Sequence, residues 1–236
     1  MKRLSNYRET INLFIIGFLG LTSILPGIYY IIFDHIPSLL LHENGIYETV
    51  GAVACFAAGL VFLCSFRLSS RKKLYILSLW MLFFAIGCLF IAGEEISWGQ
   101  HWFHYNVPGY IANNNFQHEF NLHNSMLIQS RNNSLSSIFF KLLIFYFILF
   151  PMFLEISPTI KKWSKKIFVP IPSMLIALVA LTAKFADIIN HKIIYGTSFT
   201  KDTLRLGEGL ESTFEVCLFI LAVEYFFLIR KNHARH

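Results

Sequence analysis

Residues 74–93 read LYILSLWMLFFAIGCLFIAG, 20 consecutive residues without a charged side chain. An α-helix of this length can cross the hydrocarbon layer of a bilayer, where the backbone has to satisfy its own polar groups. Five further apolar segments flank this stretch. We therefore predict an all-α integral membrane protein, a bundle of about six transmembrane helices. The predicted spans are residues 11–33, 49–66, 74–93, 138–154, 168–189 and 213–229.

The composition of the whole chain favours the same fold class. Of its 236 residues 55% are hydrophobic and only 14% are charged, whereas a soluble domain keeps roughly a quarter of its residues charged. Few residues remain outside the spans, so residues 1–236 are expected to form a single membrane domain. The four cysteines all lie in apolar runs, which argues against structural zinc and a disulfide framework.

Basic residues form four clusters that a six-helix chain places on one side of the membrane. By the positive-inside rule this side is cytoplasmic, and it includes both termini. We therefore read the net charge of +6 as a determinant of topology, with membrane lipids and not nucleic acid as partners. The clusters are Lys2, Arg3 and Arg8; Arg67, Arg71, Lys72 and Lys73; Lys161, Lys162, Lys165 and Lys166; and Arg230, Lys231 and Arg235.

Glu94 and Glu95 end the third predicted span and begin the longest outer connection, residues 94–137. If the helix continues outward, Glu94, Trp98 and His101 share one face. Adjacent carboxylates at this depth could bind a metal or act as a general acid or base. The alternative is a helix end in the headgroup layer, with solvated carboxylates and Trp98 as an interfacial anchor.

A second polar cluster lies within the same connection. Glu119 and His123 are expected to meet on one face of a helical turn, with the amides of Asn121 and Asn124 nearby. A His–carboxylate pair suits a metal site or a general base oriented by its partner. The alternative is a structured polar loop with exposed imidazoles. Residues 113–115 are interpreted only as a turn-prone polar run.

The outer ends of the last two predicted spans add further ionisable groups. Lys184, Asp187 and His191 share a face at the end of the fifth span, as functional groups or as a structural ion pair. Arg205 begins a stripe of acids on a helix that leads into the sixth span. We predict that these groups converge with the long loop, where oxygen and nitrogen ligands could hold a divalent metal ion. The candidate ligands are Glu95, His123, Asp187, His191, Glu211 and Glu215.

Small residues recur at four-residue spacing in the second predicted span. Gly51, Cys55 and Gly59 form the stripe, with Ala54 and Ala58 beside it. Such a stripe lets another helix approach closely. The neighbouring helix could belong to the same chain, to a second copy in a homo-oligomer or to a membrane partner protein.

Two motifs carry a resemblance. Gly93–Gln100 (GEEISWGQ) followed by Asn121–Asn124 (NLHN) resembles a motif pair of uncharacterised bacterial multi-span membrane proteins, in which the first motif usually continues with Arg, here His101. The resemblance implies a protein of the bacterial inner membrane. The positions that it favours as functional are Glu94, Glu95, Gln100, Glu119 and His123.

The adjacent glutamates also resemble the signature of glutamate-dependent intramembrane proteases, in which a Glu activates water. This chain lacks the Arg that follows the pair there, and its predicted topology places the pair on the opposite side of the membrane.

The leading hypothesis is a membrane-embedded enzyme with a polar Glu/His site at the extracytoplasmic face, acting on a lipid or lipid-linked substrate. Two alternatives stay open: an ion- or proton-coupled transporter or channel, and a sensor or assembly subunit that binds a partner through the long loop. The candidate catalytic residues are Glu94, Glu95, Glu119, His123 and Asp187. The supporting residues are Trp98, Gln100, Asn121, Asn124, Lys184 and Arg205.

Overall fold

The computed structural model describes part of the chain. The described residues are 32, 45–115, 118–122, 125–126, 145–150, 153, 156–159, 162 and 201–231, with the side chains of 101, 147, 148 and 201–211 excepted. The fifth predicted span, most of the fourth and all but one residue of the first lie outside this set. Within the set the protein is helical, with one isolated bridge between Asn115 and Ser125 and no longer strand.

Three long helices dominate: α3 (Ile46–Arg71), α4 (Tyr75–Glu95) and α12 (Lys201–Lys231). The first two and residues 212–231 of the third are long and apolar enough to cross a membrane. The all-helical prediction is thus confirmed for the described residues. The second and sixth predicted spans are helices that extend beyond both expected ends, and the third begins one residue later and ends two residues later than expected. The total of six spans and the cytoplasmic termini stay predictions.

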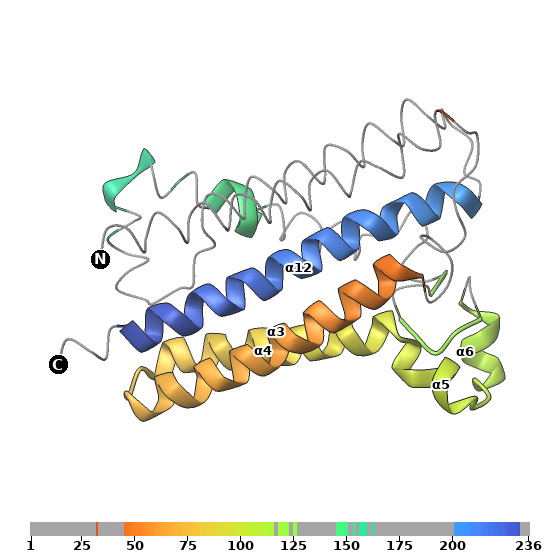
Figure 1. Cartoon of the computed structure of the whole chain (residues 1–236), viewed down its shortest axis with the longest axis horizontal. Helices are drawn as coiled ribbons and strands as arrows, with labels where there is room; N and C mark the ends of the chain where they lie inside the picture. The colour runs from red at the N-terminus through yellow and green to blue at the C-terminus, as the bar shows by residue number, and fades with distance from the viewer. Residues whose placement is uncertain are drawn as a thin grey trace.

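α3 and α4 form an antiparallel hairpin through residues 72–74, and α12 lies alongside α3 (Figure 1). The small-residue stripe makes this close packing possible. A Cβ added at Gly59 would lie 2.6 Å from Leu89 Cγ of α4, and Cys55 and Ala58 have no exposed surface. The stripe therefore packs within this chain, which confirms the first of the three alternatives.

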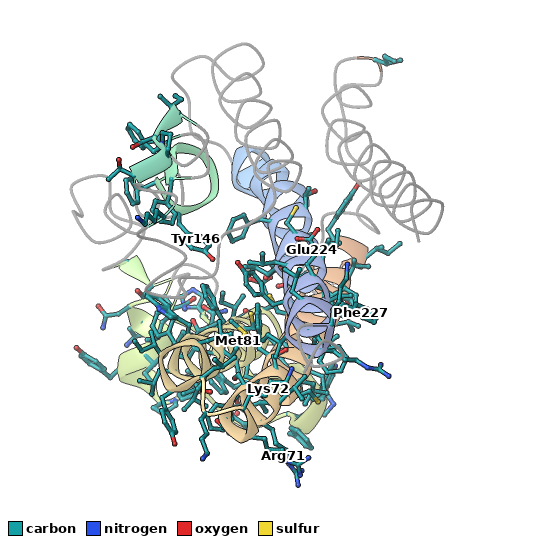
Figure 2. All side chains as sticks on the ribbon, turned by 90° about the vertical axis from the view of Figure 1, so that its left-hand side faces the viewer. Arg71, Lys72, Met81, Tyr146, Glu224 and Phe227 are labelled. Atoms are coloured by element: carbon teal, nitrogen blue, oxygen red, sulfur yellow. The ribbon has the colours of Figure 1, made fainter. Side chains whose placement is uncertain are left out.

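The interior between these helices combines aromatic packing with serine hydroxyls. Phe62 of α3 stacks on Phe84 of α4 with ring centroids 5.4 Å apart. The buried Ser78 hydroxyl donates to Ser69 Oγ at 2.9 Å and so links the two helices. Figure 2 shows Met81 among the helices, while Arg71 points away from them.

The outward face of α4 is apolar. Leu79, Phe83, Ile86 and Phe90 follow one another at helical spacing, and 65%, 65%, 60% and 43% of their surfaces are exposed. Exposed apolar surface on this scale is unfavourable in water and suits the hydrocarbon of a bilayer. We call these four residues the apolar stripe.

The two ends of the hairpin carry opposite charges. At the turn the Lys72 ammonium donates to the Ile229 carbonyl and ties α12 to the hairpin. We call this the basic end; its residues are Arg67, Arg71, Lys72, Lys73, Arg230 and Lys231. At the other end, here the acidic end, α3 begins near Glu48 and α4 finishes at Glu95. Three helices thus show the charge segregation expected from the sequence.

Candidate functional site

The chain turns sharply where α4 ends. Ser97, Trp98 and Gly99 are consecutive residues with positive φ, at 44°, 54° and 83°. The left-handed region costs a non-glycine residue roughly 1–2 kcal/mol, and among these three only Gly99 adopts it freely. The helix therefore does not continue outward, and the condition under which Glu94, Trp98 and His101 would share one helix face is not met. Trp98 nevertheless reaches Glu94, because the turn folds its indole back over Gly93, where an added Cβ would lie 2.9 Å from the ring.

Glu94 joins the end of α4 to a segment far along the chain. Its side chain is 5% exposed. One carboxylate oxygen accepts a hydrogen bond from the Trp98 indole at 2.7 Å, and the other accepts from the Leu122 N–H at 2.6 Å. Gln100 Oε1 accepts in the same way from the Phe120 N–H at 2.7 Å. These bonds hold residues 119–122 against the helix end and compensate for the strained turn.

Glu119 is the second buried acid of this region, with 4% of its surface exposed. Its Oε2 accepts hydrogen bonds from the Ser97 hydroxyl and, at 2.8 Å, from Asn121 Nδ2. Asn121 Nδ2 also donates to Ser97 Oγ at 2.9 Å. Asn115 Nδ2 donates to Asn121 Oδ1 at 2.8 Å, and Asn115 Oδ1 accepts from the Glu119 N–H. We call Glu94, Ser97, Asn115, Glu119 and Asn121 the Glu94–Glu119 network.

The helical turn expected at Glu119 is not observed. Residues 118–122 are irregular, and His118 has a φ of 60°. Three of their backbone N–H groups bond instead to the side chains of Glu94, Gln100 and Asn115, which replaces the helical pattern. His123 and Asn124 lie outside the described residues, so the pairing of Glu119 with His123 stays a prediction.

A third buried acid enters from α12. Glu215 is 3% exposed, and its carboxylate occupies the space that a side chain on Gly51 would fill, since a Cβ there would lie 1.7 Å from Oε2. The Cys55 thiol lies near this carboxylate. Ser212, one turn earlier on α12, donates to the Tyr47 carbonyl and fixes α12 against the start of α3.

Glu95 belongs to the same region as Glu215. The charges of both carboxylates act on the Cys55 thiol, and that of Glu215 also acts on Cys88 of α4. α4 and α12 therefore each bring a carboxylate into the neighbourhood of Cys55 of α3. We call Glu95 and Glu215 the carboxylate pair.

The predicted site residues thus divide into three sets. Glu94, Trp98, Gln100, Glu119 and Asn121 come together at the end of α4, and Glu95 and Glu215 approach Cys55. The side chains outside the description are His123, Asn124, Lys184, Asp187, His191, Arg205 and Glu211.

Sequence reasoning missed three polar residues that the structure buries here. Ser97, Asn115 and Ser212 are 1%, 1% and 4% exposed. Asn115 is part of the buried network instead of a surface turn. Their shared signal is a small polar residue close to an acid in an apolar chain, which is too common to single them out.

The described residues do not form a metal centre. Among them, no group of three or more His, Cys, Asp or Glu side chains could hold a metal ion. Only Glu95 and Glu215 of the six predicted ligands have described side chains, so the metal stays a prediction. Both oxygens of Glu94, and Oε2 of Glu119, accept hydrogen bonds from N–H or O–H donors.

Comparison with known proteins leaves the function to be argued from this geometry. No family model, no curated protein and no solved structure matches the chain.

Proposed function

We propose that this protein is a membrane-embedded enzyme whose polar site lies at the acidic end and acts on a lipid or lipid-linked substrate. One observation carries the proposal: Glu94, Glu119 and Glu215 are 5%, 4% and 3% exposed in an otherwise apolar helical protein. Burial of ionisable groups at membrane depth is costly, and such groups usually mark function. In the proposed topology the acidic end faces outward from a bacterial inner membrane.

The contacts suggest two roles for the acids. Glu94 and Glu119 bond to backbone and side-chain donors, so we assign them to positioning: they hold residues 118–122 against the end of α4 and the turn that follows it. The carboxylate pair has the acid–base role. In this proposal the two carboxyl groups lie close enough to avoid ionising together, so one keeps a proton while the other accepts one.

His123 fits this arrangement by its place in the sequence. It follows Leu122, whose N–H bonds to Glu94, and we propose it as a further acid–base group. Asp187 is proposed as a polar group of the same site. These two assignments rest on the sequence alone.

A lipid substrate suits the position of the site. The acids lie where helices able to cross a membrane end, which is the depth of lipid headgroups and glycerol esters. The apolar stripe on α4 offers acyl chains a path along the same helix. A water-soluble substrate has no acyl chain that could bind along the apolar stripe.

The test is turnover of defined lipids by purified protein in liposomes. Phospholipids, glycolipids and a polyprenyl-phosphate-linked sugar are presented singly, and products are measured by mass spectrometry. Glu95→Gln and Glu215→Gln should each lower the rate by about 100-fold or more, the usual contribution of general acid–base catalysis. Glu48→Gln is the matched control, because Glu48 lies at the same end in the first turn of α3.

The outcomes separate the possibilities. Loss of turnover in both variants but not in the control supports the proposal, provided that all three unfold at the wild-type temperature. Equal turnover in all four proteins would remove the carboxylate pair from the mechanism. If the folded wild-type protein converted none of the lipids, the proposal that it is a lipid-modifying enzyme would be refuted.

A second candidate is a proton-coupled transporter. The observation in its favour is that Glu215 lies inside a helix segment able to cross the membrane, in contact with Gly51 and Cys55 of α3. Transporters bind coupling ions on such buried groups, although usually nearer the midplane. Proton flux into vesicles that Glu215→Gln abolishes, without chemical change to any lipid, would favour this candidate.

A further inference from the structure

The segment after the left-handed turn exposes aromatic rings. It contains the short helices α5 (Gln100–Phe103) and α6 (Gly109–Asn113), which lie at the acidic end of α4 (Figure 1). Three of its rings are among the most exposed, at 65% for Trp102, 76% for Phe103 and 83% for Tyr110. We call this set the aromatic collar; its residues are Trp98, Trp102, Phe103, Tyr105 and Tyr110.

The collar belongs to a stretch without charge. Residues 96–118 contain no Asp, Glu, Lys or Arg; of the acids next to this stretch, Glu94 and Glu119 are buried and Glu95 is half-buried. A loop of this length in water normally carries charged side chains. Rings with an apolar body and a polar edge, and no ionised neighbours, fit the boundary between lipid headgroups and acyl chains.

The collar also continues a surface that already suits lipid. Phe90, the last residue of the apolar stripe, packs edge-on against Trp98 with ring centroids 5.6 Å apart. The exposed apolar surface therefore runs from the middle of α4 into the collar without interruption. A protein partner would have to cover both parts, whereas a lipid leaflet meets both at once.

The collar is fixed to the helix end. The Tyr105 hydroxyl donates to the Ser97 carbonyl at 3.1 Å, and its ring packs edge-on against Phe120 at 6.1 Å. The depth of the collar thus follows the depth of α4.

We propose that the aromatic collar inserts into the headgroup–acyl boundary of the leaflet at the acidic end. There it anchors α4 and sets the depth of the buried acids. The occupant of this surface is phospholipid. The inference rests on the exposed surface alone and holds whether the protein is an enzyme or a transporter.

The experiment measures the depth of two indoles in the full-length protein in phosphatidylcholine vesicles. The contribution of Trp102 is the fluorescence lost in Trp102→Phe, and Tyr110→Trp adds a second reporter at an exposed site. Quenchers are a nitroxide on the lipid headgroup, bromine near the glycerol, bromine near the acyl ends, and iodide in water. Phe83→Trp is the matched control, because Phe83 lies on the apolar stripe near the middle of α4.

Both collar reporters should be quenched at least about twofold more strongly by the two shallow probes than by the deep one, since interfacial segments lie roughly 5–10 Å into the boundary. The Phe83→Trp indole should show the reverse order. Quenching of both collar reporters by iodide alone would place the collar in water. Protection from every probe would mean that a protein surface covers it. Either result would overturn the proposal.

Discussion

Gly51→Ala is expected to destabilise the protein, because the new methyl group meets the buried carboxylate of Glu215. Real Cβ atoms do not come within 3.0 Å of another atom, and Oε2 would lie 1.7 Å away, so it must retreat by the difference, about 1.3 Å. The room for this retreat is small, because Glu215 is 3% exposed and its Cδ would also lie 2.9 Å from the new methyl group. Overpacking of this kind costs about 1–3 kcal/mol, and the better helix propensity of Ala offsets about 0.5–1 kcal/mol.

The net loss should be up to about 2.5 kcal/mol in the free energy of unfolding. It can be measured by titration of detergent-purified protein with dodecyl sulfate, followed by circular dichroism. The matched control is Gly87→Ala, since a Cβ at Gly87 meets nothing within 4 Å. This control substitution should leave the free energy of unfolding unchanged or raise it slightly. The double variant Gly51→Ala/Glu215→Ala should recover part of the loss. If Gly51→Ala were as stable as Gly87→Ala, Glu215 would not occupy this space.

Three further predictions concern the ends of the hairpin. Asn121→Ala removes two hydrogen bonds, to Ser97 Oγ and to Glu119 Oε2, at about 0.5–1.5 kcal/mol for each bond lost. Amide exchange should accelerate in residues 96–115, and unchanged exchange would contradict the network. Gly99→Ala places a side chain at a φ of 83° and should lower the free energy of unfolding by about 1–2 kcal/mol. The control Gly109→Ala has open space around it and should cost less. Equal unfolding midpoints of the two variants would contradict the left-handed conformation at Gly99. Burial lowers the pKa of Lys72 from 10.5. The unfolded chain therefore binds this proton more tightly, so stability should rise with pH from the folded pKa up to 10.5. Lys72→Met should abolish this rise of the unfolding free energy with pH, measured by unfolding titrations at alkaline pH. A wild-type stability that does not change with pH in this range would contradict the prediction.

The helices and their packing faces could be predicted from the sequence because they depend on local pattern. Twenty uncharged residues predict α4, and small residues at four-residue spacing predict a close helix contact. The placement of Gly51 and Cys55 against α12 agrees with that reading. The sequence also predicts acids at one end of the hairpin and bases at the other.

The turn at Ser97–Gly99 could not be predicted, because it is fixed by bonds between distant residues. Nothing local favours positive φ at Ser97 or Trp98. The conformation persists because Glu119 and Asn121 bond to Ser97, and Leu122 bonds to Glu94, 28 positions earlier. A helical continuation was the natural expectation from local pattern alone. Asn115 was misjudged for the same reason, since its partners lie in a segment that local pattern does not place.

The three-residue turn between α3 and α4 has a consequence for biosynthesis. Because the connection is so short, the two helices enter the membrane together as a hairpin. Arg71, Lys72 and Lys73 lie at its turn, and Glu94 and Glu95 lie at its opposite end. An inside-negative membrane potential favours each ionised carboxylate carried outward by about 2.3 kcal/mol per 100 mV, and it opposes export of the bases by the same amount. The charges at both ends therefore favour the same orientation of the hairpin in the membrane. In the proposed topology an energised membrane would orient the hairpin during insertion, and depolarised cells should accumulate inverted hairpins.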